Sequence, residues 1–559
     1  MGIVRKKRKK WGVGLAQKDV LIIGAGPVGL TMANQLARYG VDFEIIDQKA
    51  GCSLYSKALG VHARTLEMFD MMGMVDKFLD RGLKGTGLEI NFSDGLRLEV
   101  DVSHIDGQTS YPYLLILPQS ETEKILEENL KEKFKHQVKW SHELMEIRQT
   151  SDGVEAVVND SDGTENVLTA KYLIACDGAH SRVRHLLNTP FEGSTESVQV
   201  MLGDVKIDPP LESKNFSVFA SPKGVIALAP FKEDYTRVIA IDFAKQDRGK
   251  DVKVSMDDLQ DSIANIRSEE IKISDPFWLS QFTASHRQVP QYRYQNIFYA
   301  GDAAHIHNPL GGQGMNLGIQ DAVNLSWKLA MALKRNVLSG LLDTYYEERH
   351  PIAASVLRRT DFLLKMMTLK NKRLFRLRNF VAGKVTSIGK VQEKLAENVS
   401  QLVHNYKDNK QSLEVNKASD RANGLKSGAR VADASFQTSG VPVNRMYRVL
   451  RDGKFVLLVR SKPGSIEADV VGLLDYQRKF EERFGEFVRP FIVTSNQLPL
   501  EQIPVGVEWI ADDKGELADE YGLREGSLLL VRPDGYASFS CPEIDFVKLE
   551  ELVLKYLCV

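Results

Sequence analysis

Cysteine is scarce in this chain. Its 559 residues contain four cysteines, Cys52, Cys176, Cys541 and Cys558, and no two of them form a CxxC pair. Disulfide frameworks and structural zinc sites need cysteines at short, regular spacings. The scatter therefore predicts a reducing, cytoplasmic setting and no structural metal.

Long apolar runs are also missing. None approaches the roughly 20 residues that a membrane-spanning helix needs, so no transmembrane segment is predicted. The N-terminus carries a basic cluster at residues 5–10 but no apolar segment before the first strand, which excludes a secretory signal. Lys6 stands where a myristoylation motif has Ser or Thr. Residues 1–18 are predicted to be a basic disordered tail, with surface tethering as the alternative.

The chain has no strong excess of charge. Lysines and arginines number 73 and acids 74, which gives a net charge of −1. A global attraction to nucleic acid is therefore not expected. The length exceeds one hydrophobic core, so two to four domains are predicted.

What is present begins with a strand–turn–helix unit, "DVLIIGAGPVGLTMANQLARYGVDFEIIDQK". A strand at 20–23 leads into Gly24, Gly26 and Gly29, which form GxGxxG, and a second strand ends at Asp47. The glycines allow a sharp turn, close approach of backbone amides to a pyrophosphate, and tight helix–strand packing. An acid at the end of the second strand is placed to accept hydrogen bonds from ribose. This unit predicts a dinucleotide site and leaves NAD and FAD open.

Three further stretches follow in order. They are "KALGVHARTLEMFDMMG" at 57–73, "YLIACDGAHSRVRHLL" at 172–187, and "GDAAHIHNPLGGQGMN" at 301–316. Together with GxGxxG they resemble the FAD-dependent aromatic hydroxylases, the single-component flavoprotein monooxygenases, over about residues 19–365. The resemblance implies tightly bound FAD and NADPH or NADH as transient co-substrate. It also implies oxygen transfer from a flavin C4a-hydroperoxide to a phenolic or polycyclic ring.

The resemblance also implies the cofactor-binding residues. These are Gly24, Gly26, Pro27, Gly29, Asp47, Lys57, Arg64, Gln119, Asp177, Gly178, Arg287, Gly301, Asp302, Pro309, Gly311, Gly312, Gly314, Met315 and Asn316. Lys57 stands where the family usually has arginine, and Asn308 where it often has a second proline. Arg287 could also be a plain surface charge. No substrate-activating base can be singled out.

His305 and His307 raise the alternative of a metal site. They are two residues apart on a predicted loop, and no cysteine or further acid stands at ligand spacing. Histidines in such loops more often hydrogen-bond to backbone, so no metal is predicted.

The domain order follows from periodicity and from the resemblance. Residues 190–285 alternate with period two, which predicts antiparallel strands. With residues about 80–115 they would form a substrate domain interleaved with the FAD-binding domain at 19–365. Residues 366–423 are predicted connecting helices. Residues 424–559 resemble a thioredoxin-like domain without CxxC, which points to a structural or dimer-contact role. The fold class is thus α/β, with a Rossmann-like domain, an antiparallel substrate sheet and a thioredoxin-like C-terminal domain.

Some alternatives stay open. The basic amphipathic segment 362–385 could lie on a membrane surface, although such segments more often pack on their own protein. The function could be that of a flavin-dependent reductase, or of an aromatic-binding flavoprotein without turnover. No WxWxIP motif of the flavin halogenases occurs. The expected partners are an aromatic small molecule and O2. A homodimer is left open, and no nucleic-acid partner is expected.

Overall fold

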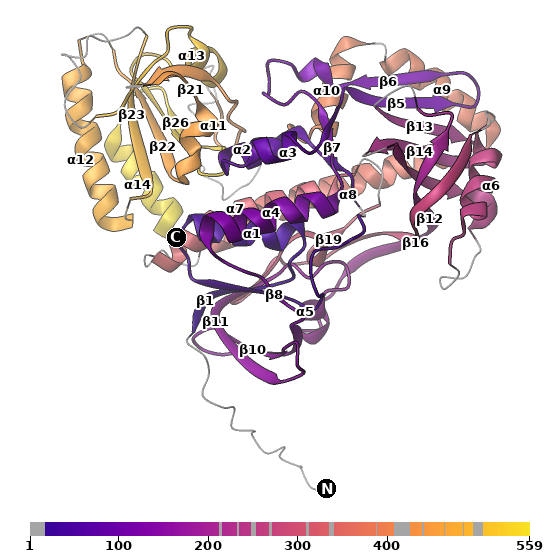
Figure 1. Cartoon of the computed structure of the whole chain (residues 1–559). Helices are drawn as coiled ribbons and strands as arrows, with labels where there is room; N and C mark the ends of the chain where they lie inside the picture. Colours follow the sequence, from indigo (N-terminus) through magenta and orange to yellow (C-terminus); the bar gives the residue numbers. More distant parts are fainter. Residues whose placement is uncertain are drawn as a thin grey trace.

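A computed structural model describes most of the chain. The described residues are 17–56, 58–211, 215–231, 234–246, 253–267, 271–308, 312–334, 340–386, 388–406, 425–438, 441–462, 464–484, 486–495 and 507–558. Two long helices, α7 (Gly314–Lys334) and α8 (Gly340–Met367), cross the middle of the molecule. One sheet lies below them, a second to one side, and the C-terminal sheet to the other (Figure 1). Among the described residues, no helix is long and apolar enough to cross a membrane.

The first sheet is largely parallel and has the order β17-β18-β11-β1-β2-β8, with β10 and β9 branching from β11. Its strands are β1 (Lys18–Ile23), β2 (Phe43–Asp47), β8 (Lys139–Trp140), β9 (Glu143–Gln149), β10 (Val154–Asn159), β11 (Glu165–Ala175), β17 (Arg293–Tyr294) and β18 (Ile297–Tyr299). β1 pairs in parallel with both β2 and β11. The carboxyl ends of the central strands therefore meet at one edge, where ligands of open α/β sheets bind.

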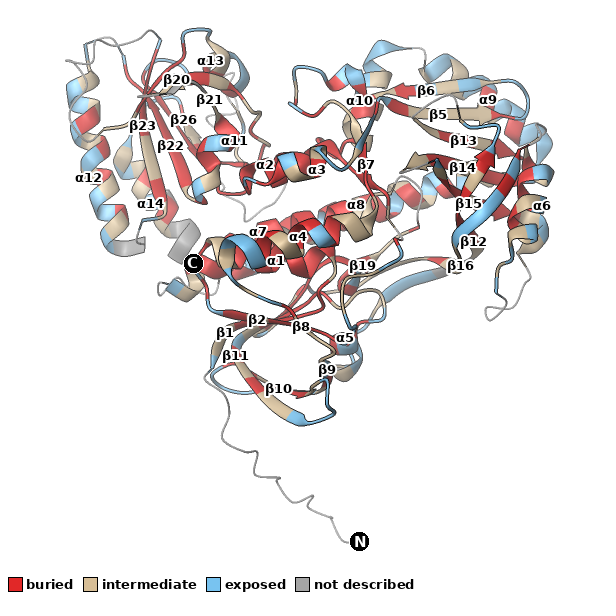
Figure 2. Cartoon of the chain, in the orientation of Figure 1, coloured by how far each residue is buried: buried red, intermediate tan, exposed pale blue. Residues whose placement is uncertain are grey.

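Three helices cover one face of this sheet: α1 (Pro27–Arg38), α4 (Gln119–Phe134) and α7. α1 packs against both others. Figure 2 shows α1 and α7 buried along most of their length. Every residue of α7 from Met315 to Met331 is buried, polar ones included. A helix buried on all sides must pair its polar side chains internally.

Shorter elements connect this layer to the rest. They are α2 (Ala63–Met71), α3 (Val75–Leu79), α5 (Arg182–Leu186), and a small sheet of β3 (Gly60–Val61), β7 (Leu114–Ile116) and β4 (Leu83–Gly85).

The second sheet has the order β19-β16-β12-β15-β14-β13-β5-β6. Its strands are β5 (Gly87–Phe92), β6 (Arg97–Asp101), β12 (Glu192–Asp208), β13 (Phe216–Ser221), β14 (Gly224–Phe231), β15 (Tyr235–Asp242), β16 (Lys272–Gln288) and β19 (His305–Ile306). β13 pairs in parallel with β5, which joins the two separated segments of the predicted substrate domain in one sheet. The strands β12 to β16 pair antiparallel, as their alternation predicts.

Helix α6 (Met256–Ile266) covers one face of this second sheet. Its Leu259 and Ile263 pack against Ile226, Leu228 and Val238. Ser255 caps the helix, and Asp258 completes a capping box. Because side chains alternate along a strand, the neighbours of these residues point to the other face.

Beyond α8 come α9 (Lys372–Thr386) and α10 (Gly389–Val399), within the predicted connecting region. α9 and α10 pack against β6 at the edge of the second sheet. Residues 407–424 lie outside the described residues.

The C-terminal sheet has the order β21-β20-β24-β23-β22-β25-β26. Its strands are β20 (Ser435–Thr438), β21 (Val441–Arg445), β22 (Phe455–Arg460), β23 (Val488–Thr494), β24 (Trp509–Ala511), β25 (Ser527–Val531) and β26 (Ala537–Cys541). Its helices are α11 (Met446–Val449), α12 (Ile466–Phe484), α13 (Glu516–Tyr521) and α14 (Phe546–Cys558). The three central strands β22, β23 and β24 are parallel and the flanking ones antiparallel. That this domain is thioredoxin-like stays a prediction.

Candidate cofactor and active site

The glycine turn after β1 is shaped by close packing. Gly24 has φ +100°, and a Cβ there would lie 2.5 Å from the carbonyl oxygen of Cys176. A Cβ on Gly29 would lie 1.9 Å from the carbonyl oxygen of Gly24. Gly26 has open space around it and is the N-cap of α1, with no side chain capping the helix and Pro27 at its first turn. The free amides of that helix end are therefore open to an anion.

Asp47 lies beside this turn, at the end of β2. Its Oδ2 accepts a hydrogen bond from the Ala25 amide at 2.7 Å, and its Oδ1 accepts one from the Lys49 amide at 2.8 Å. The carboxylate is thus held in place next to the turn, with lone pairs left on both oxygens. This is the position from which an acid binds ribose hydroxyls in dinucleotide folds.

The N-terminus of α4 fixes the loop that precedes β3. Gln119 donates to Glu123 at 2.8 Å, and Glu123 accepts the Ser53 amide at 2.9 Å. Burial raises the pKa of Glu123, while Gln119 and the Ser53 amide act against the rise. Gln119 is thus a support for this loop. Lys57, in the same loop, lies outside the described residues.

The described parts of the 301–316 stretch, residues 301–308 and 312–316, lie close to one another. Gly301 has φ +60°, and a Cβ there would lie 2.7 Å from the Val28 side chain of α1. Asp302 follows in a 3₁₀ turn, Gly301–Ala303, and is exposed. A Cβ on Gly314 would lie 3.1 Å from His307 Nε2 and 3.8 Å from Asp302 Oδ1. Asp302, His307 and the N-terminus of α7 therefore lie together. Pro309 and Gly311 lie outside the described residues.

Asn316 joins the start of α7 to β3. Its Oδ1 accepts the His62 amide at 2.9 Å, and its Nδ2 donates to the Gly60 carbonyl at 2.9 Å. His62 Nε2 lies 3.2 Å from the carbonyl oxygen of Gly312, which has φ +59°. Met315 is buried beside it. These bonds join the start of α7 to β3 and to His62.

The site carries buried polar atoms that fit a bound cofactor. Among the described residues, neither His307 Nε2 nor Asp177 Oδ1 has a hydrogen-bond partner, and both atoms are buried. Buried polar atoms are normally paired. Asp177 lies next to the glycine turn, since its Cα is 2.8 Å from a Cβ built on Gly24. The site thus offers free amides at the start of α1, the Asp47 carboxylate, and unpaired polar atoms on Asp177 and His307. This set suits a dinucleotide such as FAD.

Comparison with known proteins decides the family. The model of the FAD binding domain matches residues 17–360. The chain belongs to this family of flavoproteins. YhjG of Bacillus subtilis, named an uncharacterized aromatic compound monooxygenase, is 35% identical over 81% of this chain and 88% of its own. Pentachlorophenol 4-monooxygenase of Sphingobium chlorophenolicum is 30% identical over 93% of each chain. The anhydrotetracycline hydroxylase OxyS of Streptomyces rimosus superposes with a TM-score of 0.76 at 29% identity, covering 97% of this chain and 99% of that one.

These findings confirm the predicted fold class, with its Rossmann-like FAD-binding domain. They also confirm that the protein is an FAD-dependent monooxygenase of the aromatic hydroxylase type. The individual residues that bind FAD stay predictions, which the geometry of the site supports to different degrees.

The Asp177–Gly178 loop of the monooxygenase is hydrogen-bonded to the Gly301–Ala303 turn through Arg184. Asp177 Oδ2 accepts the Val183 amide at 3.1 Å, and Gly178 has φ +80° with open space around it. Burial raises the pKa of Asp177, against hydrogen bonds that lower it. Arg184 donates to the carbonyls of Ala303 and Ala179 at 3.1 and 2.6 Å. It therefore bridges the two loops, a role that the sequence did not reveal.

Arg287 lies on β16, where it pairs with Ile306 of β19. Its Nη1 donates to the Phe191 carbonyl at 3.2 Å. β16 thereby connects the second sheet directly to residues 305–306 of the 301–316 stretch. This position is compatible with a role near the cofactor, and that role stays a prediction.

Arg64 was also predicted to bind the cofactor, and that role stays a prediction. Its guanidinium is fully buried, pairs with Glu67 at 2.8 Å and donates to the Asp534 carbonyl at 2.9 Å. It also lies over the Tyr536 ring at 4.7 Å. Its contacts therefore join α2 to the C-terminal domain. A sequence motif alone cannot show whether an arginine contacts a cofactor or another domain.

The two loop histidines have different partners. His305 Nε2 lies 2.7 Å from Asp321 Oδ2, and His307 Nδ1 lies 2.6 Å from the Asn308 carbonyl oxygen. Within the described parts of the chain, no three His, Cys, Asp or Glu side chains are grouped to hold a metal ion. Burial lowers the pKa of His307, which favours the neutral ring beside Asp302.

Asp321 of α7 holds the Gly301–Ala303 turn in place. The sequence did not single it out. Asp321 accepts the Gly301 amide at 3.1 Å and Arg349 Nε at 2.7 Å, as well as His305. Burial by itself raises the pKa of Asp321, but Arg349 and His305 more than offset it and lower the pKa. The place of Asp321 as an acid among the apolar residues of α7 is the sequence feature that could have pointed to it.

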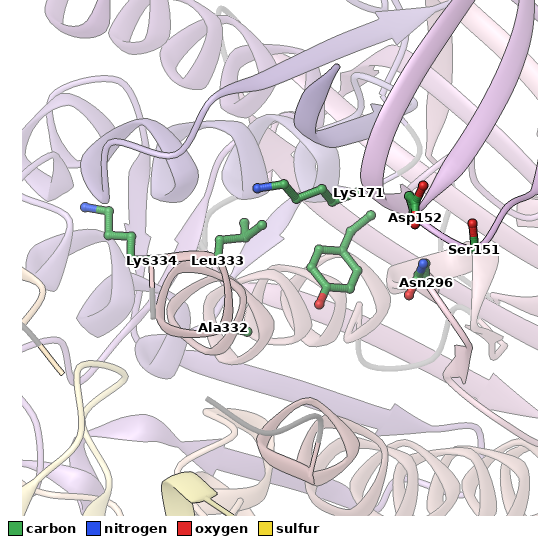
Figure 3. Close-up of a pocket in the computed structure, with 8 residues that line it drawn as sticks. Ser151, Asp152, Lys171, Asn296, Ala332, Leu333 and Lys334 are labelled. Atoms are coloured by element: carbon green, nitrogen blue, oxygen red, sulfur yellow. The ribbon is translucent and has the colours of Figure 1, made fainter. Parts of the chain in front are cut away.

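A cavity of about 530 Å³ lies away from this edge (Figure 3). It is lined by Ser151, Asp152, Lys171, Tyr172, Asn296, Ala332, Leu333 and Lys334. Its α7 residues lie at the C-terminal end of that helix, roughly 30 Å from the flavin loop at 1.5 Å per residue. The cavity is therefore separate from the flavin site.

Proposed function

We propose that the monooxygenase hydroxylates a phenolic or polycyclic aromatic ring, using NADPH or NADH as reductant and O2 as oxygen donor. The names of its relatives, which act on pentachlorophenol and anhydrotetracycline, support this substrate class. The observation that carries the proposal is a sheet face of mixed apolar and aromatic character, which adjoins the flavin loop.

That face belongs to the second sheet and lies opposite α6. Alternation along β14 and β15 places Ala227, Ala229 and Ile239 there, since Ile226 and Leu228 face α6. Ala229 packs with Leu59, which lies just before β3 in the FAD-binding domain. At Ala229 this face therefore meets the FAD-binding domain, while Ala227 and Ile239 pack in the cluster with Leu364 of α8 and Phe375 of α9. β16 and β19 continue the sheet to residues 305–306.

A buried ion pair and aromatic rings lie on the same face. Arg237 pairs with Asp204 through two hydrogen bonds of 2.7 Å. The guanidinium lies 5.7 Å from the Trp278 ring centroid, and Tyr55 of the FAD-binding domain stacks on Trp278 at 5.8 Å. A mostly apolar surface with one fixed polar group is typical of small-molecule sites.

The cofactor roles follow from position. We propose that Gly24, Gly26, Pro27, Gly29 and Asp47 bind the ADP half of FAD at the N-terminus of α1. The flavin half would lie against Gly301, Asp302, Gly312, Gly314 and Asn316, where the start of α7 offers a positive dipole end. Reduced FAD supplies the electrons that activate O2. The protein's part is to place the ring and to exclude water.

The nicotinamide co-substrate is assigned to the Asp177–Gly178 region. The open side of Gly178 supports this proposal. We also propose a cytoplasmic location, which the scarcity and spacing of cysteine support. A homodimer stays a prediction from the sequence.

A substrate screen tests the proposed function. We expect one or more phenols or polycyclic aromatics to accelerate NAD(P)H oxidation by the FAD-loaded protein. Trp278→Phe should then raise the KM of that substrate about threefold to tenfold, the range for one aromatic contact. Trp509→Phe is the matched control, because Trp509 lies on β24 (Trp509–Ala511) of the C-terminal sheet.

Other results would point to the alternatives. Equal hydride transfer without O2 would favour a reductase. Tight aromatic binding that never stimulates NAD(P)H oxidation would favour a binding flavoprotein.

A further inference from the structure

An apolar surface lies uncovered at the end of α8 and along α9. Of fifteen large apolar side chains exposed in the described part of the chain, eight lie between residues 362 and 388. They are Phe362 (60% exposed), Leu363 (49%), Leu374 (52%), Leu377 (60%), Phe380 (62%), Val381 (51%), Val385 (43%) and Ile388 (53%). We call this set the α8–α9 patch. Such a concentration of exposed apolar groups marks an interaction surface.

The orientation of α9 is fixed by its inner side. Phe375 is buried, and its ring lies 6.0 Å from that of Phe92 on β5. Asn379 donates to both carboxylate oxygens of Asp94 at 2.8 Å. Residues 374, 377, 381 and 385 recur at helical spacing on the opposite side. The outward stripe is therefore a property of the folded protein, because turning it inward would break these contacts.

Within the chain segment that carries the patch, the charge has one sign. Between residues 362 and 392 the chain contains no Asp or Glu and eight cations. They are Lys365, Lys370, Lys372, Arg373, Arg376, Arg378, Lys384 and Lys390. All except the half-buried Arg378 are exposed. Lys365 lies 2.8 Å from Asp361, the acid that borders the run. In a chain with a net charge of −1 this is a strong local excess.

We propose that the α8–α9 patch docks the protein on the surface of an anionic lipid bilayer. Its apolar side chains would enter the boundary between headgroups and acyl chains, and its lysines and arginines would pair with acidic headgroups. The helix would lie in the plane of the interface.

A second copy of the chain suits this patch less well. A two-fold interface places the same surface on both sides, so eight cations would face eight more. An anionic bilayer supplies the opposite charge over its whole area.

The position of the patch gives docking a consequence. Phe375 and Leu364 pack in one cluster with Ile241 and Phe282 of the second sheet. In Figure 1, α9 lies beside this sheet and away from the C-terminal sheet. Docking would therefore bring the proposed substrate sheet close to the bilayer, where apolar aromatic compounds collect.

Vesicle flotation of the FAD-loaded, full-length protein tests the proposal. We expect binding to vesicles of phosphatidylcholine mixed with phosphatidylglycerol, and little binding to phosphatidylcholine alone. Raising the salt from about 0.1 to 1 M shortens the screening length from about 10 to 3 Å, so binding should weaken strongly.

Two pairs of variants locate the binding surface. Leu377→Asp with Val381→Asp, and separately Arg373→Glu with Arg376→Glu, should each weaken binding to the mixed vesicles at least about tenfold. These side chains are exposed, so folding and FAD content should not change. Val471→Asp on α12, and Arg448→Glu with Lys514→Glu, are matched controls at exposed positions of the C-terminal domain and should leave binding unchanged.

The basic N-terminal cluster is the competing explanation for any binding. A chain that starts at residue 17 should still bind the mixed vesicles. Loss of binding in that chain, or unchanged binding in both α9 variants, would overturn the proposal. The proposal would also be overturned if the protein did not bind vesicles but formed a dimer, and Leu377→Asp dissociated that dimer.

Discussion

Gly29→Ala is expected to weaken FAD binding about a hundredfold. The new Cβ would lie 1.9 Å from the carbonyl oxygen of Gly24, well inside van der Waals contact. The atom it meets belongs to the backbone, so α1 or the glycine turn must move by more than an ångström. The amides at the start of α1 would then miss the pyrophosphate. Loss of two or three such hydrogen bonds corresponds to about a hundredfold weaker binding.

Two other glycines separate the causes of that loss. A Cβ on Gly26 meets no atom within 4 Å. Gly26→Ala should therefore keep the stability of the apoprotein but weaken FAD binding, because its methyl group enters the space for the pyrophosphate. Gly389→Ala, also in open space, should change neither. Quenching of flavin fluorescence on titration of the apoprotein measures the Kd. A wild-type Kd for Gly29→Ala would contradict the assigned role of this turn.

Arg532→Met is expected to destabilise the protein by about 3–5 kcal/mol, the cost of breaking a buried charge pair. Arg532 donates to both oxygens of Glu348 at 2.6 and 2.9 Å, and both side chains are buried. Glu348 also receives Lys328 at 2.8 Å. The pair joins α8 to the C-terminal domain. Removing the guanidinium leaves Glu348 with one cation in place of two, and it also removes the ion-pair partner of the buried Asp534 carboxylate.

The same pair predicts a dependence on pH. Burial raises the pKa of Glu348, but Arg532 and Lys328 outweigh it and lower the pKa to about 2 in the folded protein, from an ordinary 4.5. A carboxyl whose pKa falls on folding stabilises the protein above its unfolded pKa. That stabilisation should be lost as the pH falls from about 4.5 toward 2. Arg532→Met should reduce this loss.

Urea unfolding at several pH values measures both effects. Arg524→Met, at an exposed position of the same domain, is the control and should stay within about 0.5 kcal/mol of wild type. If Arg532→Met matched the control at neutral pH, the pair would not hold the two domains together.

Local patterns predicted the parts of the fold that depend on local chemistry. The strand before GxGxxG is Lys18–Ile23 where 20–23 was expected, and the second strand ends at Asp47 as predicted. Period-two alternation found β13, β14 and β15. These patterns reflect the backbone conformation and burial of neighbouring residues, and both can be read within a short window.

Contacts between distant segments could not be read in this way. Asp321 meets Arg349 and His305, and Glu348 meets Arg532, 184 residues away. Each of these charged residues looks like a surface residue until the fold buries it. The contacts of Arg64 could not be read from the sequence for the same reason, because its partner Asp534 lies in another domain.

The most direct test of the central claim is oxygen incorporation by the FAD-loaded protein under ¹⁸O2. With NAD(P)H and an aromatic compound that stimulates its oxidation, the product should carry one atom of ¹⁸O, and none should form without O2. A product that contains no ¹⁸O, or that forms equally well under nitrogen, would contradict the assignment as an aromatic monooxygenase.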